Sequence, residues 1–278
     1  MSSPLPPPGP NPHSSPTFTP PDASFPNGPS QSQLEYMRSF KFVFENPNWL
    51  VNALLSFLCQ IVAGFIPIVP QMILMGYQFE VIDNLLETRG TRYPDLNLNR
   101  IGDYLGRGVW PFLAMFVVGI AWSLVFVPFV LISVGCIAGV AGAAGQDAGT
   151  ILATIGIVLA VAIGLVLIVL MMLVVTPATL RGGLTQDFGA SFDFAWINDF
   201  VRKMWVEVLL STLFLVFASL VAIACTCGLG YFIVVPLVPF VQAHFWYQFY
   251  VLYLARGGTP VPVKKVTMPT NAITPPTY

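Results

Sequence analysis

One stretch of the chain, from Thr150 to Val175, runs for 26 residues without a charged side chain. A helix needs ~20 apolar residues to cross the hydrocarbon core of a bilayer, so this stretch is long enough to span it. Apolar residues make up 55% of the whole chain and charged residues 9%, against roughly 25% charged residues in soluble domains. With a mean hydropathy of +0.74, the sequence predicts an all-α integral membrane protein.

The lysines and arginines predict how the chain crosses the membrane, because all twelve fall in four clusters around three apolar blocks. The clusters are Arg38 and Lys41; Arg89, Arg92, Arg100 and Arg107; Arg181, Arg202 and Lys203; and Arg256, Lys264 and Lys265. Cytoplasmic loops concentrate Lys and Arg, so the simplest topology places every cluster inside the cell. Each block must then leave and return. This predicts about six transmembrane helices in three hairpins, in the inner membrane, with both termini cytoplasmic.

The three apolar blocks differ in length. Phe112 to about Val175 and Val206 to about Leu254 are each long enough for two spanning arms. Trp49 to about Phe79 is only 31 residues, and its second arm of about 14 residues reaches only ~21 Å. The first hairpin is therefore expected to be partly re-entrant or to thin the bilayer. The competing interpretation is a single crossing, which leaves Arg38 and Lys41 outside.

A short amphipathic segment precedes each block. Ile101–Arg107 and Ile197–Lys203 share the pattern Ile-x-Asp-aromatic-aliphatic-x-basic, and Tyr36, Phe40, Val43 and Phe44 form a similar stripe before the first block. Such helices lie in the membrane plane with the apolar face in lipid. We interpret the chain as three copies of one unit, an in-plane helix followed by a hairpin. The acid-first pairs Asp103 with Arg107 and Asp199 with Lys203, four residues apart, are expected to stabilise these helices.

These patterns divide the chain into three parts. Residues 1–33 contain eleven prolines and no Lys or Arg, which is typical of a disordered tail. Residues 34–258 form the predicted transmembrane domain, with units of about 34–96, 97–189 and 190–258. Residues 259–278 carry five more prolines and are expected to form a flexible tail.

Two segments resemble a known family. Residues 236–250 read Pro-Leu-Val-Pro-Phe-Val-Gln-Ala-His-Phe-Trp-Tyr-Gln-Phe-Tyr and lead into Tyr253-Leu-Ala-Arg-Gly-Gly258. Met75-Gly-Tyr-Gln-Phe-Glu-Val-Ile82 precedes a polar loop that contains proline. Together they resemble bacterial membrane proteins of the domain-of-unknown-function 4013 family, over roughly Trp49 to Gly258. The resemblance implies a bacterial multi-pass protein and carries over no catalytic residue.

His244 is the strongest candidate for a polar site inside the membrane. It lies twelve residues before Arg256, which is about 18 Å along a helix. If Arg256 marks the cytoplasmic boundary, His244 is therefore near the middle of the bilayer. Tyr247 and Gln248 follow on the same face of the helix and form a polar stripe with it. Ionisable residues within a membrane are rare, and a functional role is their default interpretation. The alternative is a neutral imidazole bonded to a neighbouring helix through Gln78.

Small residues recur every four positions in the middle block. One row contains Gly135 and Gly139, and the other contains Gly156, Ala160 and Gly164. Small residues at this spacing let helix backbones approach closely in lipid. We therefore expect the two arms of this hairpin to pack through them, a permeation path being the alternative. The four cysteines are likewise expected to pack between helices.

The acidic stripe Glu80, Asp83, Asn84 and Glu87 has two interpretations, a solvated helix face or a cation site. The sequence contains no HExxH, GxSxG, P-loop or Rossmann motif, so we expect neither an enzyme nor a bound metal or cofactor. The net charge of −1 does not favour nucleic acid. The expected partners are the lipid bilayer and another membrane protein or a second copy of the chain.

Two functions from different classes follow from these features. The first is a non-catalytic protein that organises partners or the bilayer, because the in-plane helices are the most repeated polar feature. The second is a channel or secondary transporter for a small solute or ion, because internal repeats are common among transporters.

Overall fold

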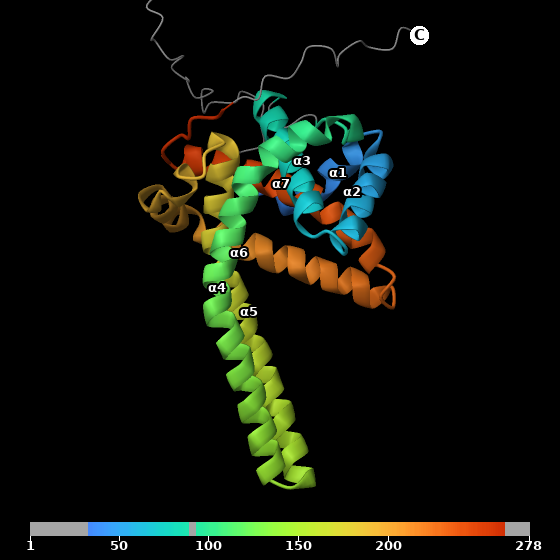
Figure 1. Ribbon diagram of the computed structural model, residues 1–278, viewed down its shortest axis with the longest axis vertical. Helices are drawn as coiled ribbons and strands as arrows, with labels where there is room; N and C mark the ends of the chain where they lie inside the picture. The colour runs from blue at the N-terminus through green and yellow to red at the C-terminus, as the bar shows by residue number, and fades with distance from the viewer. Residues whose placement is uncertain (1–32, 89–92, 265–278) are drawn as a thin grey trace, which may run out of the picture.

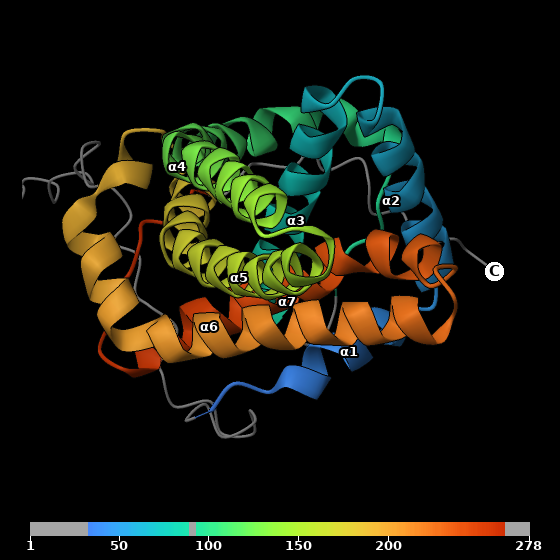
Figure 2. The ribbon, with the colours of Figure 1, turned by 90° about the horizontal axis from the view of Figure 1, so that it is seen from below.

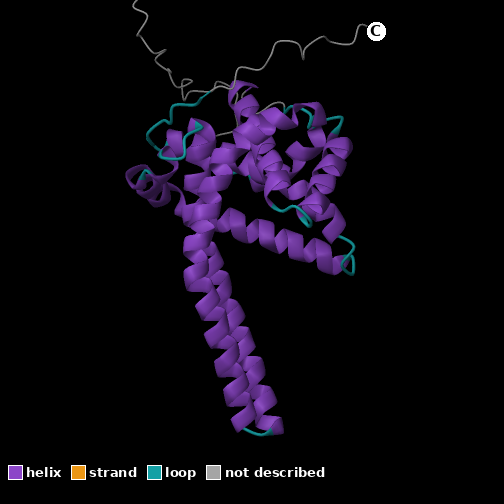
Figure 3. Ribbon diagram, in the orientation of Figure 1, coloured by secondary structure: helices purple, strands orange, loops and turns teal. Residues whose placement is uncertain are grey.

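The computed structural model describes residues 33–88 and 93–264 (Figure 1). Within these ranges every regular element is a helix (Figure 3). The α-helices are α1 Tyr36–Glu45, α2 Trp49–Ala63, α3 Ile68–Thr88, α4 Ile101–Ala143, α5 Gln146–Thr185, α6 Phe194–Cys225 and α7 Tyr231–Ala255, and the 3₁₀-helices are η1 Leu98–Arg100 and η2 Ala190–Phe192. The all-helical prediction is confirmed. The predicted tail 1–33 falls outside these ranges except for its last residue.

The molecule has two parts, a helical head and a long hairpin (Figure 1). We define the head as residues 33–88, 93–114 and 175–264, and the hairpin as residues 115–174. Ala144 and Gly145 separate the hairpin's arms, and Gly145 has a φ of +79°, which favours glycine. Each arm contains 29 helical residues, about 43 Å at 1.5 Å per residue. This length crosses ~30 Å of hydrocarbon and reaches the far headgroups.

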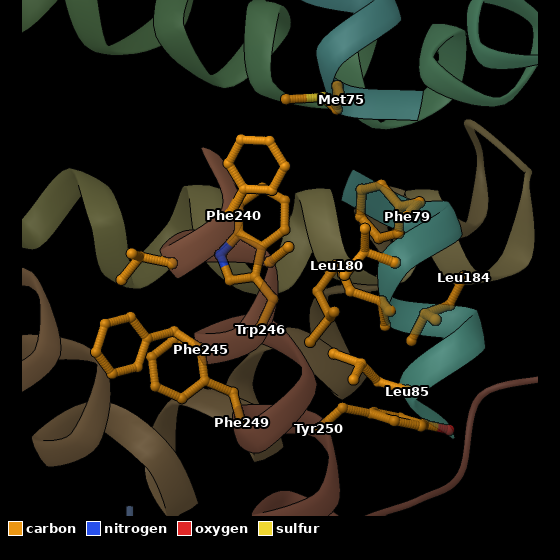
Figure 4. Close-up of a cluster of buried hydrophobic side chains, with 14 of the residues drawn as sticks. Met75, Phe79, Leu85, Leu180, Leu184, Phe240, Phe245, Trp246, Phe249 and Tyr250 are labelled. Carbon is orange, nitrogen blue, oxygen red and sulfur yellow. The ribbon is translucent and has the colours of Figure 1, made fainter. Parts of the chain in front are cut away.

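The hairpin and the head differ in what their side chains contact. None of the most apolar 18-residue window of α4 or of α5 is buried within the described protein, so this apolar surface needs lipid or a partner around it. Helix α3, by contrast, is buried at every position from Ile73 to Ile82. The core around it combines α3, α5 and α7, including Phe79, Leu180 and Trp246 (Figure 4).

Four described helices, α4 to α7, are long and apolar enough to cross a membrane. Helix α2 is too short, because its 15 residues span about 22 Å. Helix α3 has 21 residues but carries Glu80, Asp83 and Glu87. The prediction of six transmembrane helices in three hairpins is therefore not confirmed. The C-terminal part of α6 also runs crosswise to the hairpin, along the side of the head from which the hairpin projects (Figures 1 and 2).

The predicted in-plane helices contact protein through their apolar faces. Only α1 is a separate helix, since the other two segments are the first turns of α4 and α6. In the third segment Ile197, Phe200 and Met204 are all buried in the head, with the Phe200 ring 5.2 Å from the Tyr253 ring. The expectation that this stripe lies in lipid was wrong, because α7 packs over it. The predicted threefold repeat stays a prediction.

The C-terminal tail begins later than predicted. Residues 259–264 pack on the head: Val261 is 1% exposed and its N–H donates to the Tyr250 hydroxyl at 3.0 Å. The Lys264 N–H donates to the Leu184 carbonyl at 2.9 Å. These contacts extend the folded head beyond the predicted boundary at 258. Residues 265–278 lie outside the described ranges.

Candidate functional site

His244 lies in a polar cluster between α7 and α1. The side chain is 2% exposed, and its Nδ1 lies 2.9 Å from the Ser39 hydroxyl and 2.9 Å from Nε2 of Gln248. The Gln248 amide also bonds the Glu35 backbone, accepting from its N–H at 2.8 Å and donating to its carbonyl at 3.2 Å. Nε2 of Gln248 also donates to the Ser39 hydroxyl at 2.9 Å, so Ser39, His244 and Gln248 lie within hydrogen-bond distance of one another. The Phe42 ring lies 4.4 Å from the imidazole.

This cluster differs from the predicted site in its partners. Gln78 does not reach His244; it donates to the Pro239 carbonyl at 2.9 Å. The Tyr247 ring centroid lies 5.9 Å from the imidazole centroid. Ser39 was missed because only the packing of α1 on α7 brings it to His244. The only sign of this contact in the sequence was that Ser39 is a single polar residue on the apolar face of α1. The cluster attaches α1 to α7.

The acidic stripe of α3 pairs with arginines. Glu80 is 4% exposed and accepts two bonds from Arg100, at 2.8 and 3.0 Å. Asp83 pairs with Arg107, which is 5% exposed. The predicted pair of Asp103 with Arg107 is therefore wrong, because Arg107 turns towards α3 and Asp103 lies 3.3 Å from Arg100. Two acids of the stripe thus bind arginines, and Glu80 is buried, so the interpretation as a solvated helix face does not hold for it. Among the described residues no group of three or more His, Cys, Asp or Glu is placed to hold a metal ion, the alternative interpretation.

The predicted pair Asp199 and Lys203 is present, with 2.8 Å between the side chains. It does more than support its own helix. Asp199 accepts from the Tyr253 hydroxyl at 2.8 Å, and Lys203 donates to the Gly257 carbonyl at 3.0 Å. Arg256 pairs with Glu207 nearby. These contacts fasten the start of α6 to the end of α7.

A second polar cluster joins the loop before α4 to the start of α2. Asp95 accepts from Asn46 at 2.9 Å, Asn48 at 2.7 Å and Asn52 at 3.1 Å, and the Leu96 N–H donates to Asn52 at 3.0 Å. Partial burial opposes ionisation of Asp95, but the three amide donors outweigh it and lower its pKa below the usual value. In the sequence, the only sign of this cluster was the presence of three asparagines within the seven residues from Asn46 to Asn52.

Of the two rows of small residues, only the row on α5 contacts the other arm of the hairpin. An added Cβ at Gly156 would lie 2.8 Å from the Ile137 side chain and one at Gly164 3.9 Å from Phe129, whereas Gly135 and Gly139 have no described atom within 4 Å. The expectation that the two arms pack through both rows was therefore wrong for α4, because a Cβ at either of its glycines would meet open space. Ala160 lines an apolar groove between the arms.

The tightest approaches in the described chain involve other glycines. A Cβ at Gly76 would lie 1.9 Å from the Tyr104 carbonyl oxygen, and one at Gly108 would lie 1.9 Å from that of Met72. At Gly183 it would lie 2.1 Å from the Phe79 ring. These glycines are spread over three helices, so no single periodic row marked them in the sequence.

Three of the four cysteines differ from their predicted role. Cys136, Cys225 and Cys227 are exposed, and Cys59 is half-buried. Cys59 packs against the core of the head, as predicted, whereas the three exposed cysteines do not fill space between the described helices.

Comparison with known proteins identifies the family of this chain. The family profile described as "protein of unknown function (DUF4013)" matches residues 59–235, well over half of the sequence. A search of curated proteins and of solved structures finds no similar chain. The matched range includes both hairpin arms, the α3–α4 ion pairs and the whole of α6. The chain therefore belongs to the DUF4013 family of proteins of unknown function.

Proposed function

We propose that this protein is a non-catalytic membrane protein that organises partners or the bilayer around its hairpin. The observation that supports this is the hairpin itself, whose most apolar windows in α4 and α5 have no buried residue in the described protein. A surface of this length and apolarity is stable only where lipid or another apolar surface covers it. The partners we propose are the bilayer and a membrane protein or a second copy of the chain.

The linings of two grooves favour this function over transport. The groove between α4 and α5 is lined by apolar side chains and Ser133, and that between α1, α6 and α7 by apolar side chains and Ser219. Solutes and ions that cross a membrane need polar groups along their path. His244, the strongest sequence candidate for such a group, is 2% exposed and bonded to Ser39 and Gln248.

The arginines support an orientation. Arg100, Arg107 and Arg181 lie in the head, and Asp147 is the only charged residue between Arg107 and Arg181. By the positive-inside rule we propose that the head and both termini are cytoplasmic, in the inner membrane.

Reconstitution of the purified protein in sealed vesicles tests this function. We expect the same ion and solute permeability for protein-free vesicles, the wild type and His244→Gln. A photo-crosslinker at Leu131 or Ile132, which are 67% and 65% exposed, should give adducts of one discrete mass in cells. A crosslinker at buried Leu180 is the control.

One result would contradict the proposal, and another would narrow it. Wild-type permeability above that of empty vesicles, lowered by His244→Gln without a change in thermal stability, would identify a transporter. Crosslinks to lipid alone at every hairpin position would exclude a partner and leave only a bilayer role.

A further inference from the structure

The side of the head from which the hairpin projects is bordered by apolar segments. The α2–α3 turn, the C-terminal part of α6 and the α6–α7 turn all lie on this side (Figures 1 and 2). Phe65 in the first turn is 84% exposed, Phe217 in α6 is 67% exposed, and Leu229 in the second turn is 69% exposed. We call these three segments the apolar platform.

The platform contains no charged residue. The sequence contains no Asp, Glu, Lys or Arg from 49 to 79 or from 208 to 255. Turns that face water are usually rich in polar residues. Burial of apolar surface is worth roughly 25 cal/mol per Å², so these largely exposed Phe and Leu side chains are stabilised by an apolar partner.

The direction of α6 indicates which helices cross the bilayer. The C-terminal part of α6 runs crosswise to the α4–α5 hairpin (Figure 1), whereas transmembrane helices tilt by at most roughly 40° from the bilayer normal. If the hairpin stands close to the bilayer normal, this part of α6 lies at a steeper tilt than transmembrane helices adopt, and the hairpin and α6 do not both cross the bilayer. The hairpin is the better candidate, because its 29-residue arms are longer than the 18 residues from Val208 to Cys225.

We propose that the hairpin is the only part of the described chain that crosses the bilayer, and that the platform lies in the leaflet nearest the head. The partner is lipid, because the platform continues the apolar surface of a hairpin whose 29-residue arms are long enough to cross the bilayer. An apolar helix that lies in the interface plane buries its exposed face among the acyl chains and headgroups. An apolar groove of about 200 Å³, lined by α1, α7 and this part of α6, adds further surface for acyl chains. This inference does not depend on the proposed function.

The position of the α6–α7 turn tests the inference. Three full-length variants each carry one cysteine in a background without the others: the native Cys227 in the turn, Asp147→Cys at the hairpin tip, and Thr259→Cys on the head. Each is labelled with the fluorophore NBD in sealed membrane vesicles of either orientation. Dithionite, which does not cross membranes, then quenches the probes on one side. We expect Cys227 to be quenched from the same side as Thr259→Cys, and Asp147→Cys from the opposite side.

Lipids with a doxyl quencher at a shallow or a deep acyl position then identify what covers the turn. With purified protein in vesicles we expect the probe at Cys227 to be quenched more strongly by the shallow quencher than by the deep one. An unchanged thermal midpoint shows that each labelled variant is folded.

Every other outcome overturns the proposal. Quenching of Cys227 from the side of Asp147→Cys would mean that α6 and α7 cross the bilayer. Quenching of Asp147→Cys from the side of Thr259→Cys would mean that the hairpin does not cross. No dithionite quenching of Cys227, or none by doxyl lipid, would place the turn at the bilayer centre or under protein.

Discussion

The crossing of α3 and α4 gives the sharpest test of this fold, because two glycines face backbone there. A Cβ at Gly108 would lie 1.9 Å from the Met72 carbonyl oxygen and 2.9 Å from the Gly76 nitrogen. Gly76 faces the Tyr104 carbonyl oxygen at the same 1.9 Å. Backbone atoms cannot rotate away as side chains do, so alanine at either site must push the helices apart by roughly 1 Å or more. Overpacking of this kind typically costs about 1–3 kcal/mol.

The expected loss for Gly108→Ala is at the upper end of this range. Separation of the helices also stretches the Arg100–Glu80 and Arg107–Asp83 pairs, which join α3 to η1 and α4. A loss of 2–3 kcal/mol corresponds to a thermal midpoint lower by roughly 5–10 °C for a chain of this size. The assay is thermal unfolding in a mild detergent, followed by tryptophan fluorescence.

The matched control lies on the same helix. Gly135 has open space around its Cβ position, so Gly135→Ala meets no clash and gains helix propensity of up to about 1 kcal/mol. We expect its thermal midpoint to be unchanged or higher. If Gly108→Ala were as stable as Gly135→Ala, the close crossing of α3 and α4 would be wrong.

Three further predictions concern the polar contacts of the head. Ser39→Ala removes the hydroxyl partner of His244 and should cost about 0.5–1.5 kcal/mol of stability in detergent, the typical worth of one hydrogen bond. Asp83→Ala deprives the buried guanidinium of Arg107 of its acidic partner and should cost about 3 kcal/mol or more, measured as a fall in thermal midpoint. Because the pKa of Asp95 is lowered on folding, the stability it contributes is present above its unfolded pKa of ~3.9 and is lost as pH falls through its lower folded pKa. The thermal midpoint of Asp95→Asn should therefore be below that of the wild type at pH 7, with a difference that shrinks as pH falls below about 4.

Exposed positions provide the controls for these changes. Ser123, whose hydroxyl bonds only the carbonyl of its own helix at Ile120 among the described contacts, should tolerate alanine. Asp103 is 44% exposed in its pair with Arg100, so Asp103→Ala should change stability by at most about 1 kcal/mol. Equal losses at Ser39 and Ser123, or at Asp83 and Asp103, would contradict the contacts assigned here. A difference for Asp95→Asn that stays constant with pH would contradict the lowered pKa.

Part of the candidate site was open to prediction from sequence. His244 and Gln248 are four residues apart on one helix, so their proximity follows from helix geometry alone. Their partner could not be predicted in this way. Gln78 fitted the expected register between α3 and α7, but Ser39 takes that place because α1, far away in the chain, packs over this part of α7. The two predicted ion pairs differ in the same way. Asp199 and Lys203 are four residues apart on one helix and form the pair that helix geometry predicts. Arg107 instead pairs with Asp83 on another helix, a contact that only the packing of α3 on α4 produces.

The sequence by itself determined the apolar character and the helical class of this protein. The charge-free run from Thr150 to Val175 and the four clusters of Lys and Arg are local properties of the chain, and they suffice for an apolar all-helical fold. The tertiary structure decided which apolar surfaces meet each other. Ile197 and Phe200 lie against α7 instead of lipid, while Phe217 stays exposed on a helix that runs crosswise to the hairpin. An apolar side chain has the same periodicity whether lipid or protein covers it, so only the arrangement of the helices separates the two.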